Sequence, residues 1–65
     1  MNEDWIKIMD SENSLEVNVL SAKLEDAGIN VVVLDKTDSA YVVLGRTELY
    51  VLKSELEKAR KVIES

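Results

Sequence analysis

The chain has 65 residues with no cysteine and no histidine, and its thirteen acidic side chains outnumber eight basic ones. This composition excludes disulfides and the usual zinc and iron ligand sets, and the net charge of −5 disfavours nucleic acid as a partner. The length and an apolar share of 46% predict one globular domain, residues 1–65, with a small core.

The N-terminal segment 5–9 alternates in a way that predicts a half-buried strand. Ile6 and Ile8 are expected on one face of it, and Trp5, Lys7 and Met9 on the other. The polar run 10–14 that follows offers several possible helix N-caps.

A first helix is predicted over residues 14–27, and Asn13 is the favoured N-cap because Glu16 occupies the capping-box position three residues later. One apolar stripe is expected to face the core and comprises Val17, Leu20, Leu24 and Ala27. A second stripe on roughly the opposite side comprises Leu15, Val19 and Ala22. Because a helix packed on a single sheet needs only one apolar stripe, the second stripe indicates a partner.

Gly28 is expected to end this helix, because glycine readily adopts the left-handed backbone that caps the last carbonyls. A β-branched run follows at once and predicts a second strand over 29–34. The polar residues 35–39 predict a turn. A third strand is expected to open at 41–44, and a bulge at Gly45, which we favour over a two-residue hairpin turn there, would join it to 47–52.

The third strand is expected to turn Leu49 and Val51 inward. The sequence Ser54-Glu55-Leu56-Glu57 matches a capping box and predicts a second helix from this point. Its expected apolar face comprises Leu56, Ala59, Val62 and Ile63.

The order β-α-β-β-α predicts an α+β fold, a ferredoxin-like half with an antiparallel or mixed three-stranded sheet. The third strand is expected between the first two, with both helices on one face of the sheet. The first strand is then an edge, and exposed edges are often paired with another chain.

Several segments together resemble a known family. They are Trp5-Ile6-Lys7-Ile8, the run from Leu24 to Val32, Asp38-Ser39-Ala40-Tyr41, Gly45, Glu48-Leu49-Tyr50-Val51 and Glu57-Lys58-Ala59. The pattern is similar to that of a small bacterial domain of unknown function, described as a putative prokaryotic signal-transducing protein, and most resembles its Bacteroidetes members. This resemblance implies a compact fold related to the nitrogen-regulatory PII proteins and the ferredoxin-like class.

Two sets of residues are candidates for binding. The possible partner-binding residues are Trp5, Leu15, Val19, Ala22, Tyr41 and Tyr50. The possible ligand loop contributes Lys36, Asp38, Ser39 and Arg46. Lys36, Ser39 and Arg46, with Thr37 and Gly45, could receive an anion, whereas Asp35, Asp38 and Ser39 could supply oxygen ligands to Mg²⁺ or Ca²⁺. The spacing does not fit an EF-hand, so turn formation is the favoured reading, and no metal site or cofactor is expected.

We expect no enzymatic activity, because the chain has no histidine to act as general base and is too short for a deep cleft. Apolar runs such as 31–34 cannot cross a membrane, and the acidic N-terminus is unlike a secretory signal, so a cytoplasmic protein with no membrane partner is expected. The leading hypothesis is a non-enzymatic signalling or regulatory module that contacts itself, as a homodimer, or another protein. The alternative is a sensor of a small anion or metal at residues 35–46.

Overall fold

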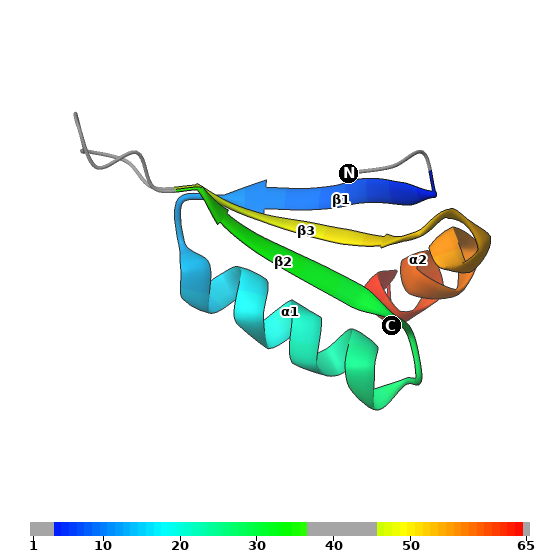
Figure 1. Cartoon of the computed structure of the whole chain (residues 1–65). Helices are drawn as coiled ribbons and strands as arrows, with labels where there is room; N and C mark the ends of the chain where they lie inside the picture. Colours follow the sequence, from blue (N-terminus) through cyan, green and yellow to red (C-terminus); the bar gives the residue numbers. More distant parts are fainter. Residues whose placement is uncertain (1–3, 37–45, 65) are drawn as a thin grey trace.

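The computed structural model describes residues 4–36 and 46–64 (Figure 1). The elements run in the order β1 (Trp5–Ser11), α1 (Ser14–Asp26), β2 (Val31–Lys36), β3 (Arg46–Leu52), the 3-10 turn η1 (Lys53–Glu55) and α2 (Leu56–Glu64). This order confirms the predicted β-α-β-β-α succession and the α+β class.

The three strands form one sheet in the order β1-β3-β2, and β3 is antiparallel to both neighbours. The third strand therefore lies between the first two, as predicted (Figure 1). β1 and β2 run parallel to each other but do not pair, because β3 lies between them. Each of the two therefore has one unpaired edge among the described residues.

The core lies on one face of the sheet. Leu49 and Val51 of β3 are fully buried, together with Val17 and Leu24 of α1 and Ala59 of α2. Because residues from both helices join one cluster with these two side chains of β3, both helices cover the same face. The inward orientation predicted for Leu49 and Val51 is confirmed.

β1 contains a bulge that the sequence did not predict. The pairing register with β3 shifts between Lys7 and Met9, so one extra residue is accommodated in β1. Ile8 and Met9 consequently both pack against the core, although strict alternation would place them on opposite faces. The predicted placement of Met9 beside Trp5 and Lys7 is therefore wrong.

Asn13 is the N-cap of α1, as predicted. Its side chain accepts hydrogen bonds from the backbone N–H groups of Leu15 (3.0 Å) and Glu16 (3.3 Å). The Asn13 N–H donates to Ser11 Oγ (3.0 Å), so Ser11 replaces Glu16 as the second member of the cap.

Gly28 ends α1 in a Schellman motif. The Ile29 N–H donates to the Leu24 carbonyl (3.0 Å), and the Gly28 N–H donates to the Glu25 carbonyl (2.9 Å). This geometry requires a positive φ at Gly28, where φ is +84°. The last helical residue is Asp26, one residue earlier than predicted.

Two residues depart from the core stripe predicted for the first helix. Ala27 lies at the C-cap and is exposed, so it does not join the core. Ser21 is buried instead, because it lies four residues after Val17 and three before Leu24, on the same side of the helix. Its hydroxyl donates to Glu25 Oε1 (3.3 Å), which satisfies the buried polar group.

β2 begins at Val31, two residues later than predicted. Ile29 lies in the turn between α1 and β2. It is buried in the core, as the apolar residue of the Schellman motif. The backbone and side-chain amides of Asn30 both donate to Glu55 Oε1 (3.0 and 3.2 Å). This contact joins the start of β2 to η1.

The predicted capping box at Ser54 is wrong. Ser54 lies inside η1, whose N-cap is Leu52 and has no side-chain cap hydrogen bond. The chain leaves β3 directly into the 3-10 turn, so α2 starts at Leu56. Of the predicted apolar face, Ala59 is buried and Leu56 and Val62 pack against the core, whereas Ile63 is 40% exposed.

The predicted strand over 41–44 and the choice between bulge and hairpin at Gly45 lie outside the described residues. Within the described part of the chain, neither helix combines the length and the apolar composition of a membrane span.

Replacement of Gly28 by alanine tests the helix-ending motif. A Cβ at this position would meet no atom within 4 Å, so the cost arises from the left-handed backbone alone. We expect Gly28→Ala to lower the free energy of unfolding by about 1 kcal/mol, and Gly28→Asn to lower it less. Urea unfolding of the three proteins measures this order, and equal stability of Gly28→Ala and wild type would contradict it.

Candidate functional site: the open face of the sheet

The helices leave one face of the sheet uncovered, and strand alternation decides which side chains lie on it. β3 turns Leu49 and Val51 to the core, so its intervening residues face the other way. Directly paired residues share a face, which assigns the remaining positions. We define the open face by the residues Trp5, Lys7, Asp10, Val32, Leu34, Arg46, Glu48, Tyr50 and Leu52.

One half of the open face is largely apolar. Trp5 pairs with Leu52 in the ladder, and Tyr50 is flanked by Val32 of β2 and by the stem of Lys7 of β1. The apolar side chains here are all partly buried, although neither α1 nor α2 covers them. Trp5 and Tyr50, which the sequence singled out, are thus placed on the same surface.

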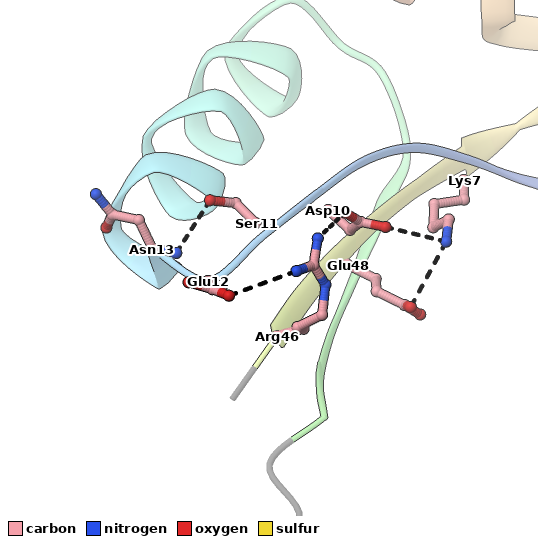
Figure 2. Close-up of polar contacts among 7 residues, drawn as sticks. All are labelled: Lys7, Asp10, Ser11, Glu12, Asn13, Arg46 and Glu48. Carbon is pink, nitrogen blue, oxygen red and sulfur yellow. Dashed lines mark hydrogen bonds and ion pairs between the residues drawn. The ribbon is translucent and has the colours of Figure 1, made fainter. Parts of the chain in front are cut away.

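The other half of the open face carries a charged cluster, defined by Lys7, Asp10, Glu12, Arg46 and Glu48 (Figure 2). The Asp10 carboxylate lies between the two cations: it contacts the Arg46 guanidinium and, at 3.1 Å, Lys7 Nζ. Lys7 Nζ also lies 3.7 Å from Glu48 Oε2, and Arg46 lies 3.8 Å from Glu12 Oε1.

The bulge in β1 makes the Lys7–Asp10 contact possible. Residues three apart in a regular strand point to opposite faces. The extra residue between Lys7 and Met9 restores both charged side chains to the open face, where they meet. The same irregularity therefore sends Ile8 and Met9 into the core and assembles the charged cluster above it.

Tyr50 connects the two halves. Its hydroxyl donates to Glu48 Oε1 at 2.7 Å, and the Glu48 side chain is only 12% exposed. A carboxylate this covered needs its hydrogen bonds, and Tyr50 and Lys7 approach different oxygens of it.

Contacts within the charged cluster shift the pKa values of Asp10, Lys7 and Arg46. Hydrogen bonds from Arg46 and then Lys7 hold the pKa of Asp10 below its ordinary value. In return, the hydrogen bond and charge of Asp10 raise the pKa of Lys7 and of Arg46. All three side chains are partly exposed, so each pair contributes little stability alone. The arrangement orients β1 against β3.

The predicted partner-binding residues fall on two separate surfaces. Leu15 and Val19 of α1 are 69% and 61% exposed, and Ala22 is exposed beside them. This α1 stripe, defined as these three residues, lies on the side of α1 away from the core and hence away from the sheet. Trp5 and Tyr50 lie on the open face, and Tyr41 lies outside the described residues.

The predicted ligand loop is placed only at its ends. Arg46 contacts Asp10 and Glu12 across the strands. Lys36 ends β2, opposite Arg46 in the ladder. Asp38 and Ser39 lie outside the described residues.

Sequence reasoning missed the charged cluster. The sequence places Lys7 in a strand and Asp10 in a capping run, and nothing in their spacing indicates that they meet. A usable signal exists in the strand pairing, because Asp10 opposite Glu48 needs a cation nearby. That pairing depends on the bulge, which the alternation of residues 5–9 does not reveal.

Asp10→Asn tests the pKa of Asp10 through stability. A lowered folded-state pKa stabilises the protein above the unfolded pKa of about 3.9, and this stabilisation is lost as the pH falls through the folded value. We expect wild type to be more stable than Asp10→Asn at about pH 7 and the difference to shrink toward about pH 2. Urea midpoints across this range measure it.

Glu12→Gln is the matched control, because it removes the same charge from a carboxylate at 3.8 Å from Arg46 that is 54% exposed. A difference of equal size and equal pH dependence in both variants would contradict the specific role of Asp10.

Comparison with known proteins adds one finding. Neither the curated proteins nor the solved structures contain a significant match to this chain. A family model does match, over residues 5–65, and the family is described as "putative prokaryotic signal transducing protein". The matched segment runs from the first residue of β1 beyond the end of α2. The chain therefore belongs to this family, as the resemblance in its sequence predicted.

Proposed function

We propose that this domain is a non-enzymatic signalling module that acts through protein–protein contacts as a homodimer. The family description supports the signalling part. The α1 stripe carries the proposal of self-contact, because Leu15 and Val19 expose 69% and 61% of their area on a helix whose other side already fills the core. Burial of such a side chain contributes up to about 2 kcal/mol.

The charges beside the stripe fit a two-fold antiparallel pair of α1 helices. Glu16 and Lys23 lie on the same flank of the stripe, three residues before and four residues after its centre near Val19. A two-fold axis at that centre places Glu16 of one copy opposite Lys23 of the other, and the reverse contact follows by symmetry. The flank of the stripe is thus self-complementary in charge.

Val19→Lys tests self-contact. Because Val19 is 61% exposed, the variant should fold normally, and two lysines at the centre of the interface should repel each other. We expect light scattering from micromolar to nearly millimolar protein to show a dimer for wild type and a monomer for the variant. Asn18→Lys is the control: it adds the same charge at the residue before Val19, whose side chain points about 100° away around the helix, and it should remain dimeric.

Charge exchange sharpens this test. Lys23→Glu should weaken the dimer, and the double variant Glu16→Lys with Lys23→Glu should restore it, because the pairs across the axis become complementary again. A wild-type monomer at every concentration would refute the dimer, and unfolding of Val19→Lys would show that Val19 belongs to the core.

The alternative, a sensor of small anions or metal ions at residues 35–46, has less support. Arg46, at the described end of this segment, already forms ion pairs with Asp10 and Glu12. An anion bound at Arg46 would have to compete with these two carboxylates. We expect millimolar inorganic phosphate, and separately Mg²⁺, to leave the melting temperature unchanged. A rise with phosphate that Arg46→Gln abolishes would favour the sensor.

A further inference from the structure

The outer edge of β1 borders a groove that the proposed dimer does not use. Among the described residues β1 pairs with β3 alone, so its other edge is open. A groove of about 280 Å³ lies between this edge and α2. Its lining residues are Ile6, Lys7, Ile8, Leu56, Arg60 and Ile63.

The ladder shows which backbone groups of β1 point out of the sheet. The Lys53 N–H donates to the Asp4 carbonyl at 2.7 Å, so Asp4 and Lys53 form a hydrogen-bonded pair. Such pairs alternate with non-bonded ones along antiparallel strands. Ile6 therefore bonds β3, whereas the N–H and C=O groups of Trp5 and Lys7 point outward. An added strand would find two donors and two acceptors here.

The groove also has a defined chemistry. Four of its lining residues are apolar and two, Lys7 and Arg60, are basic. Because the Lys7 side chain lies on the open face, Arg60 is the basic side chain that borders the groove, although the whole chain carries a net charge of −5. Lys7 is engaged by Asp10 and Glu48. Arg60 is exposed, and its side chain has no hydrogen bond or ion pair within the described part of the chain.

We propose that this groove binds an extended segment of a partner protein in which apolar and acidic residues alternate. The segment adds to β1 as a fourth strand, through the outward backbone groups of Trp5 and Lys7. Side chains on one side of it enter the groove beside Ile6 and Ile8, and a carboxylate pairs with Arg60.

A second copy of β1 is a poorer occupant. A symmetric antiparallel pair that matches Ile6 with Ile8 places Lys7 directly opposite Lys7 of the other copy, which is unfavourable. The bulge between Lys7 and Met9 also interrupts the alternation that a longer symmetric ladder needs. A different chain can supply complementary charges and its own matching irregularity.

The probe is a short fluorescent peptide of alternating valine and glutamate, titrated with the full chain and followed by anisotropy. We expect Arg60→Glu to weaken binding by about fivefold, as for one partly exposed charge pair. The same variant should bind the corresponding valine–lysine peptide better than wild type does. Lys58→Glu is the matched control, because it makes the same charge change on the other side of α2, and should leave binding unchanged.

Hydrogen exchange tests the geometry independently. The amide protons of Trp5 and Lys7 should exchange more slowly when the valine–glutamate peptide is bound, whereas that of Ile6, already bonded to β3, should change much less. No binding up to about 1 mM, equal binding of both peptides by wild type, or equal protection of all three amides would overturn the proposal.

Self-association distinguishes this proposal from the dimer. If Arg60→Glu, but not Val19→Lys, abolishes the dimer in light scattering, the edge of β1 is occupied by a second copy and the partner-strand proposal falls. Loss of the dimer in Val19→Lys with peptide binding retained supports both proposals, on separate surfaces.

Discussion

The fold depends on the burial of Leu49 and Val51 in β3. Their strand is the one described strand that pairs along both edges, and both helices pack on the face that these two side chains form. β3 comes last of the strands in the chain, so β1 and β2 have no common neighbour until residues 46–52 lie between them. The sheet and the core are therefore completed by the same event, and much of the contact is between distant parts of the sequence.

The bulge in β1 is the second constraint, and it acts on both faces at once. On the covered face it lets Ile8 and Met9 both contact the core, which is valuable in a domain whose described apolar core is small. On the open face it brings Lys7 and Asp10 together, and Arg46 then ties β1 to β3 beyond the irregularity. The charged cluster thus steadies the part of the ladder whose regular pairing the bulge disturbs.

Local signals predicted much of this structure. Asn13, Gly28 and the alternation around Leu49 and Val51 depend on residues close in the sequence, so their roles could be read directly. The bulge in β1 could not be predicted in this way, because it depends on the pairing of β1 with β3, which is distant in the sequence. For the same reason the partners of Arg46 were missed. The burial of Ser21 was not predicted, because a polar residue is not counted in an apolar stripe even when it lies on the core side of the helix. The capping box at Ser54 was wrong, because the sequence pattern does not reveal the 3-10 turn that follows β3.

The α1 stripe and the edge of β1 offer contacts of different kinds. The stripe presents apolar side chains and a flank of opposite charges, which suits a copy of itself. The β1 edge presents backbone groups and an Arg60 side chain without an ion pair among the described residues, which suits an extended acidic segment. Two copies joined through α1 carry two such edges, so a partner with two matching segments would bind the dimer far more tightly than one copy. Under the two proposals, self-association would set the strength of partner binding, which is a regulatory property that needs no reaction and no cofactor.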